Sequence, residues 1–193
     1  MQVKILSAHL FKRKVKIMDN RLIELSNSLR QGEKEYNELL KEVRHELKID
    51  IYNLEDNCAT HPEVYFKVAV IASKAGLIQN RSELIVKELK AEIATDIRSD
   101  PEKYGITKIT EGQIFEGVDS AEYAKEARKV RASCMHLKNN ADALLQAFEH
   151  RRSMLNNEVQ LFLSKLGTTN ANVKTKSIEE RLGEKKRVRR LHE

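Results

Sequence analysis

The sequence has no tryptophan and contains only two prolines and seven glycines among its 193 residues. Prolines and glycines punctuate turns, so their scarcity favours long helices over a sheet protein. The same counts, with only two cysteines, exclude collagen-like, low-complexity and disulfide-rich classes. Charged residues make up 33% of the chain, as is typical of solvated helices. The predicted fold class is all-α.

Long apolar runs are also missing. The longest stretch without Asp, Glu, Lys or Arg is Leu166–Val173, whereas a membrane-spanning helix needs about 18 to 20 apolar residues. The short apolar run Ile5–Phe11 leads into four basic residues and not into a small-residue cleavage site, so we predict no signal peptide. We expect a cytoplasmic protein without a membrane partner, located in the host cell cytoplasm if a phage encodes it.

Motifs for catalysis and for cofactor binding are not found in the sequence. It has no phosphate-cradling glycine loop, nucleophile elbow or metalloprotease helix motif. Cys58, His61, Cys134 and His136 offer four zinc-ligand types, but residues two apart on a helix point about 200° from each other. We therefore expect no enzyme activity, no cofactor and no metal site, and we assign the cysteines no redox role.

The positive charge is concentrated at the two ends of the chain. Residues 1–21 contain six basic groups and one acidic group, a charge of +5, and residues 173–193 contain eight and four, a charge of +4. The total is +6, so the remainder of the chain carries −3. Two basic ends on a nearly neutral body are typical of a protein that holds a polyanion, although solvated tails that aid solubility have the same pattern.

The chain divides into four predicted parts. These are a basic arm over 1–18, an amphipathic helix within 19–58, a helical core over 59–166, and a linker with a basic tail over 167–193. The linker, 167–176, is predicted from its composition. In the first helix, apolar residues recur every seven positions, a coiled-coil-like pattern.

The core region is predicted to start with a helix at Thr60, because Thr60-His61-Pro62-Glu63 has the form of a capping box. Gly76 and Asn80 are the candidate positions for a break in it. The helix should end before Pro101, since proline pushes the preceding residue out of the helical region.

A turn closed by a left-handed Gly105 should follow, with further helix caps at Thr110 and Asp119. One long helix is predicted over 119–166. Apolar residues recur in it at strict seven-residue intervals: Ala127, Cys134, Ala141, Phe148, Leu155 and Phe162. This stripe must be covered either by the earlier helices or by other subunits, and we expect it to mediate homo-oligomerisation.

Basic residues are the candidates for binding nucleic acid, because phosphate contact needs several cations in a line. Arg151 occupies a seam position of the long helix, where a surface turn near Glu149 and Glu158 is the ordinary interpretation. Tyr104 and Tyr123 are candidates for stacking on unpaired bases. The candidate cations are Lys87, Lys90, Arg98, Arg128, Lys129, Arg131, Arg151, Arg152, Lys185, Lys186, Arg187, Arg189 and Arg190.

Two segments resemble a phage family of recombination mediators similar to UvsY. They are KAEIATDIRSDPEKYGITKITE, Lys90–Glu111, and NADALLQAFEHRRSMLNNEVQLF, Asn140–Phe162, and the resemblance extends over 82–166. It implies a small, mostly helical, ring-forming oligomer that binds single-stranded DNA and a RecA-like recombinase. Such a protein helps the recombinase displace a single-strand-binding protein.

The family has a lysine and an arginine, two residues apart, that matter for DNA contact. The resemblance places them at Lys90 and Glu92, so the lysine matches and the arginine does not. Lys87, Arg98 or the terminal arms would then substitute. The competing interpretation is a structural or interaction protein, such as a phage scaffold or an inhibitor of a host nuclease, without direct DNA binding. A metal-dependent enzyme is the third.

Overall fold

The computed structural model describes the backbone of residues 2–190 and the side chains of residues 20–166. Within these residues the chain forms helices and no strand, which confirms the all-α prediction. Two 3-10 turns connect them, Arg44–Leu47 and Glu102–Tyr104. The α-helices are α1 Gln2–Val43, α2 Leu54–Ser99, α3 Glu111–Ser120 and α4 Glu122–Arg190.

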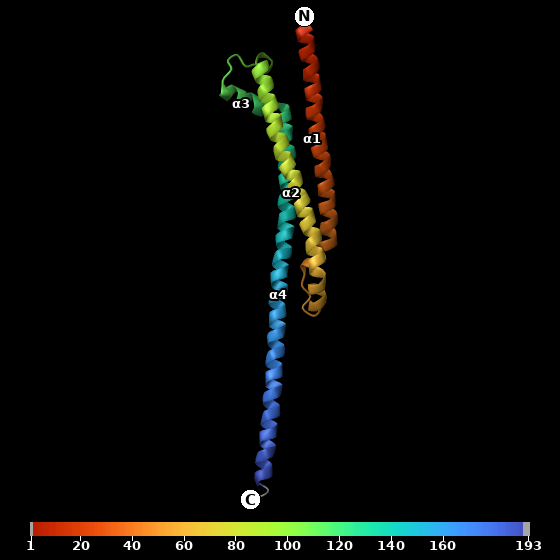
Figure 1. Cartoon of the computed structure of the whole chain (residues 1–193), viewed down its shortest axis with the longest axis vertical. Helices are drawn as coiled ribbons and strands as arrows, with labels where there is room; N and C mark the ends of the chain where they lie inside the picture. Colours follow the sequence, from red (N-terminus) through yellow and green to blue (C-terminus); the bar gives the residue numbers. More distant parts are fainter. Residues whose placement is uncertain (1, 191–193) are drawn as a thin grey trace.

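The helices form an elongated rod (Figure 1). Helices α1 and α2 make an antiparallel hairpin, whose connecting segment 44–53 we call the tip. Helix α4 runs antiparallel to α2 and continues beyond the tip, whereas the short α3 lies at the opposite end of the hairpin (Figure 1). The start of α1 and the end of α4 therefore lie at opposite ends of the rod.

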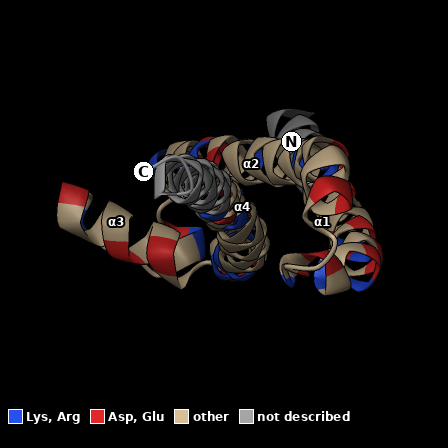
Figure 2. Ribbon diagram, turned by 90° about the horizontal axis from the view of Figure 1, so that it is seen from below, with Lys and Arg blue, Asp and Glu red and all other residues tan. Residues whose placement is uncertain are grey.

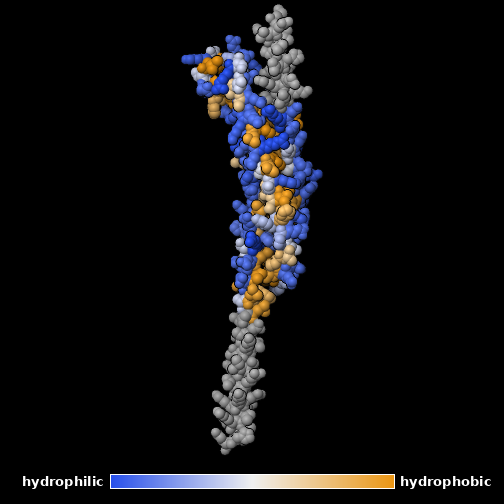
Figure 3. All heavy atoms as spheres, in the orientation of Figure 1, coloured by the Kyte–Doolittle hydropathy of each residue, from blue (hydrophilic) through white to orange (hydrophobic). Residues whose placement is uncertain are grey.

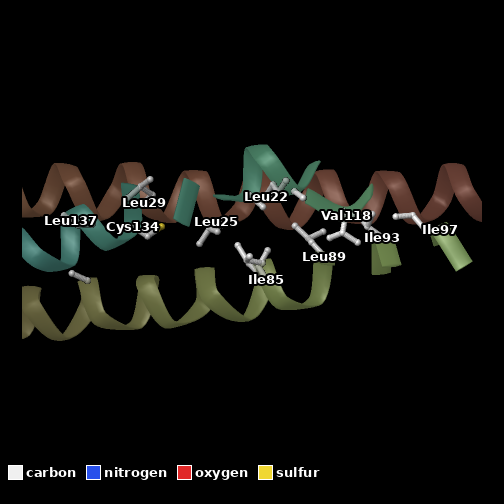
Figure 4. Close-up of a cluster of buried hydrophobic side chains, with 14 of the residues drawn as sticks. Leu22, Leu25, Leu29, Ile85, Leu89, Ile93, Ile97, Val118, Cys134 and Leu137 are labelled. Carbon is white, nitrogen blue, oxygen red and sulfur yellow. The ribbon is translucent and has the colours of Figure 1, made fainter. Parts of the chain in front are cut away.

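The main core lies between α1, α2, α3 and α4 (Figure 4). Leu25 from α1, Leu89 from α2 and Cys134 from α4 are each fully buried in it, and Val118 adds a contact from α3. Complete burial of a leucine contributes about 1.5–3 kcal/mol. A second cluster closer to the tip joins α1, α2 and α4 around Phe148, which is also fully buried. This packing holds α4 along the whole hairpin.

Helix α2 begins six residues earlier than the predicted start at Thr60. Asn57 donates from Nδ2 to the backbone oxygens of Asp50 and Asn53, at 3.0 and 2.7 Å. These bonds, with two acidic residues in the first turn, favour a helix that begins at Leu54. Thr60 caps nothing, because its hydroxyl donates to the backbone oxygen of Asp56.

The break predicted near Gly76 or Asn80 is also wrong, because α2 is continuous to Ser99. Its end before Pro101 is confirmed. The following turn closes at Gly105, which has φ = 68°, in the left-handed region that glycine adopts without strain. At Thr110 the predicted cap is confirmed, since its side chain accepts a hydrogen bond from the backbone amide of Gln113 at 3.3 Å.

The long helix differs from its prediction at both ends. Asp119 lies inside α3 and caps no helix; the residue before α4 is Ala121. At the other end, the predicted linker 167–176 is part of α4, which extends to Arg190. Helix α4 thus has 69 residues and a length of about 104 Å at about 1.5 Å per residue.

Candidate functional site

Lys90 and Arg128 meet at one carboxylate. Lys90 Nζ and Arg128 Nη1 each lie 3.1 Å from Asp119 Oδ1, and all three side chains are roughly one-third exposed. This group ties α2 and α4 to α3. The two cations are therefore structural in part, with their charge shared by Asp119.

Three further candidate cations are exposed but paired with acidic neighbours. Arg98 lies 3.1 Å from Glu111, Arg131 lies 3.1 Å from Glu83, and Lys129 lies 3.3 Å from Glu126. Surface pairs of this kind contribute about 0–1 kcal/mol each to stability, but the neighbouring carboxylate offsets the charge of the cation and repels an approaching phosphate. Acidic and basic residues are interspersed along the described helices (Figure 2).

Lys87 and Arg152 differ from the cations above. Both are exposed, and no acidic group among the described side chains pairs with either of them. They lie on different helices, Lys87 on α2 and Arg152 on α4 beside the groove that Cys58 and His61 line. Each of them is therefore separated from the other candidate cations of its own helix whose side chains are described, which are paired or buried.

Arg151 is buried, which corrects the prediction that it lies on a surface turn and can bind nucleic acid. Its side chain is only 2% exposed. Nη2 donates to Asn57 Oδ1 at 2.8 Å, Nη1 contacts Nδ1 of His61 at 3.0 Å, and a carboxylate oxygen of Glu46 lies 3.8 Å away. The guanidinium thus joins α4 to the tip and to the first turns of α2.

The contact with Arg151 determines the proton position on His61. Guanidinium has no acceptor, so Nδ1 of His61 must accept, and the proton of the neutral ring lies on Nε2. Burial, with smaller contributions from the charges of Arg151 and Arg152, lowers the pKa of His61 below its usual value. The ring stacks on Phe148 with 6.2 Å between centroids. The neutral ring is thus part of the interior.

A groove of about 680 Å³ lies beside this cluster, between α2 and α4. Cys58, His61 and Tyr65 line one side, and Arg152 and Asn156 are among the residues on the other. Cys58 is exposed and Cys134 is buried. Within the described residues no three His, Cys, Asp or Glu side chains gather where they could hold a metal ion.

The stripe expected to mediate oligomerisation is mostly covered within one chain. The sequence predicted that either the earlier helices or other subunits would cover it, and the earlier helices cover its first five positions. Phe162 alone lies outside the packed body, with 56% of its surface exposed. The buried positions, which are not available to a second subunit in this arrangement, are Ala127, Cys134, Ala141, Phe148 and Leu155.

The predicted aromatic platforms are packed as well. Tyr104 and Tyr123 both lie against the main core, and the Tyr104 hydroxyl donates to Asp96 at 2.7 Å. Burial, and then this bond to Asp96, raises the pKa of Tyr104. Stacking of bases on these two rings would require them to leave the core.

The remaining candidates, Lys185, Lys186, Arg187, Arg189 and Arg190, lie on α4 beyond the described side chains. They belong to one of the two segments with an excess of positive charge, since residues 174–190 contain eight basic and three acidic groups.

Sequence reasoning missed two features of this region. The partners of Arg151 were not identified, because Asn57 and His61 are 94 and 90 residues away in the chain. The other is the extent of an exposed apolar surface on α4, which joins the predicted Phe162 to Leu161, Leu163 and Leu166. The repeated apolar residues in the sequence were the available signal, but exposure depends on where the hairpin tip ends.

Comparisons with known proteins do not assign the chain to a family. No protein-family model, curated protein or solved structure matches it. Among the described residues, no helix combines the length and the apolar character that crossing a lipid bilayer requires.

Proposed function

We propose that the protein binds single-stranded DNA without sequence preference and assists the loading of a RecA-like recombinase in place of a single-strand-binding protein. The proposal rests on the distribution of charge along the rod. The excess of positive charge lies in the two terminal segments, +5 and +4, whereas the body carries −3. These segments lie at opposite ends of the rod (Figure 1).

Contact with phosphates explains why the binding should ignore sequence. Lysine and arginine recognise the charge of the backbone, which is the same at every nucleotide. Most body cations are shared with acidic neighbours, so we assign the main contacts to the terminal segments. Lys87 and Arg152 supply additional charge in the body.

Separate contacts at two ends of a rod suit a loading function. A strand held at both ends is kept extended, and its bases stay accessible between the contacts. A recombinase bound to the same rod would be at a high effective concentration near that strand, which favours nucleation of its filament. In this proposal the protein acts through binding and not as an enzyme, and the resemblance to UvsY-like mediators motivates the choice of recombinase class.

Fluorescence anisotropy of labelled oligonucleotides tests the binding. We expect equal affinities for oligothymidine and for a mixed sequence of the same length, with log K falling with log salt by about 0.7 for each phosphate neutralised. A flat salt titration, or no binding at low salt, contradicts the proposal. Loading is tested by the lag before recombinase filaments form on DNA coated with single-strand-binding protein, which should shorten.

The second candidate is a structural or interaction protein without direct DNA binding. The observation that favours it is the exposed apolar surface of α4, because contiguous apolar surface marks sites of protein contact. Such a protein would show no anisotropy change with oligonucleotides while still associating with other proteins.

A further inference from the structure

The groove between α2 and α4 contains a buried hydrogen-bond donor that has no acceptor among the described residues. His61 lines this groove and is only 7% exposed. Its Nδ1 accepts from Arg151, so the proton of the neutral ring lies on Nε2, and Nε2 has no hydrogen-bond partner in the described part of the chain. Buried donors without an acceptor are costly and rare in folded proteins. The Nε2 atom therefore points to an acceptor that a ligand supplies.

Two arginines make this part of the groove suitable for a negatively charged acceptor. Arg152 lines the groove, is exposed, and has no acidic partner among the described side chains. Arg151 contacts His61, and its Nε is a second buried donor without a partner in the described chain. The guanidinium group matches the two oxygens of a carboxylate or a phosphate. An oxyanion is thus the acceptor that suits these donors.

The balance of charge favours an oxyanion with a single negative charge. Glu149 also lines the groove, where its Oε1 accepts from the Tyr65 hydroxyl at 3.3 Å, and it offsets the charge of Arg152. Glu46, 3.8 Å from Arg151, offsets that second arginine. The net attraction for an anion is therefore small, whereas the cost of taking an ion out of water grows with the square of its charge. A carboxylate meets this condition better than a doubly charged phosphate.

Helix α4 also supplies apolar contact in the groove. Leu155, which is buried, and Val159, which is half-buried, both line it. Apolar surface gathers at this lower end of the described side chains (Figure 3). The groove volume of about 680 Å³ is in the usual range for sites that bind small molecules. The ligand should therefore combine one charged group with a short hydrocarbon part.

We propose that the groove binds a small carboxylate with a short hydrocarbon chain. His61 Nε2 donates to one carboxylate oxygen, Arg152 pairs with the same group, and the hydrocarbon chain lies against Leu155 and Val159. This inference does not rest on the proposed DNA binding, whose main contacts are assigned to the terminal segments. The two proposals can fail separately, because no nucleic acid is needed to fill the groove.

The reaction of Cys58 with iodoacetamide measures whether the groove is filled. Cys58 is exposed and lines the groove, whereas Cys134 is buried. We expect sodium butyrate to slow this reaction until a plateau is reached. Sodium acetate should require about a fivefold higher concentration, because it lacks the two methylene groups that contact the apolar residues. No protection by butyrate, or equal protection by sodium chloride at the same ionic strength, overturns the proposal.

Three variants test the role of each charge. R152Q should weaken butyrate binding about tenfold through the loss of a charged hydrogen bond. E149Q should strengthen it, because the amide oxygen can still accept from Tyr65 while the negative charge is removed. The matched control is K129Q, which removes an exposed cation of α4 outside the groove and should leave the affinity unchanged. Circular dichroism checks the folding of each variant. Wild-type affinity in R152Q, equal loss in K129Q, or weaker binding in E149Q overturns the proposal.

NMR of the imidazole rings tests the hydrogen-bond donor. Butyrate should shift the Nε2–H signal of His61, which is identified by its loss in H61N, and should leave the signals of the exposed His45 unchanged. An unchanged His61 signal at a butyrate concentration that protects Cys58 overturns the assignment of Nε2. Inorganic phosphate and oligothymidine are compared in the alkylation assay. If either protects Cys58 at a lower concentration than butyrate, the groove takes a phosphate or the DNA strand, and the carboxylate proposal is wrong.

Discussion

Arg151 approaches His61 so closely that its Nη1 lies 3.0 Å from Nδ1 of the imidazole ring, in the interior between α4 and the start of α2. Of the cations expected to bind nucleic acid whose side chains are described, Arg151 is the one that is buried. Its neighbour Arg152 is exposed. The two arginines, adjacent in sequence, therefore serve different purposes, and they form a matched pair for mutation.

Replacement of Arg151 should destabilise the fold. In R151A the side chain of Asn57 and Nδ1 of His61 lose their donor, and a void forms beside Phe148. We expect the free energy of unfolding to fall by about 2–4 kcal/mol, as measured by urea denaturation. R152A, at an exposed position, should change it by no more than about 0.5 kcal/mol. Equal effects of the two variants would contradict the burial of Arg151.

The stability of the protein should depend on pH through His61. Its pKa is lowered in the folded state, mainly by burial, so the unfolded chain takes up a proton first as the pH falls. Stability should therefore be constant above the unfolded pKa of about 6.5 and should decrease below it, until the pH reaches the folded pKa.

Urea midpoints at neutral and mildly acidic pH measure this decrease. H61N is the informative variant, since its Oδ1 can accept from Arg151 in place of Nδ1 while the side chain does not titrate. The loss between the two pH values should be smaller in H61N than in the wild-type protein. An identical loss in both would assign the effect to other groups.

The glycines inside the helices should respond in opposite ways to substitution. A Cβ at Gly76 meets no atom within 4 Å, whereas one at Gly32 lies 2.8 Å from Ile78 Cδ1 and 3.0 Å from Leu137 Cδ2. G76A should therefore stabilise the protein by about 0.5–1 kcal/mol through helix propensity. G32V should destabilise it, by about 1–3 kcal/mol, because its larger side chain forces α1 away from α2 and α4. Thermal melts of both variants check the signs.

DNA binding should be weakened more by changes in the basic end of α4 than by changes in the body. Neutralising Lys185, Lys186 and Arg187 together should reduce the salt slope by about two, at about 0.7 per lost phosphate contact. The control removes three cations that have acidic partners: R98A/K129A/R131A should leave the slope nearly unchanged. If anisotropy titrations showed a larger change of slope for R98A/K129A/R131A than for the variant at the end of α4, the main DNA contact would lie on the body.

Local signals in the sequence predicted several features correctly. The all-α class follows from the scarcity of turn residues, and the end of α2 follows from Pro101. The turn at Gly105 and the cap at Thr110 were also identified, because each depends on residues within a few positions of it. The capping boxes at Thr60 and Asp119 were false, because the Thr60 hydroxyl donates to Asp56 within α2 and the Asp119 carboxylate accepts from Lys90 and Arg128.

Features that depend on contacts between residues far apart in the chain could not be predicted from local sequence signals. The periodic stripe of α4 is clear in the sequence, but periodicity cannot say whether α1 and α2 or another subunit covers it. The position of the tip decides this, because Leu155 lies within the hairpin and Phe162 lies beyond it. The role of Arg151 depends on the same placement, through Asn57 and His61.

One uninterrupted helix bears both the buried Arg151 and the exposed Phe162, with eleven residues from one to the other and no glycine or proline between them. No glycine or proline separates the exposed part of α4 beyond the tip from the part that packs on the hairpin, so the two parts should move as one rigid helix. A molecule that binds at Phe162 is therefore expected to shift the guanidinium of Arg151, which contacts Glu46 of the tip. Binding of a molecule near Phe162 should then change the NMR signals of the His61 imidazole, although the two residues do not touch.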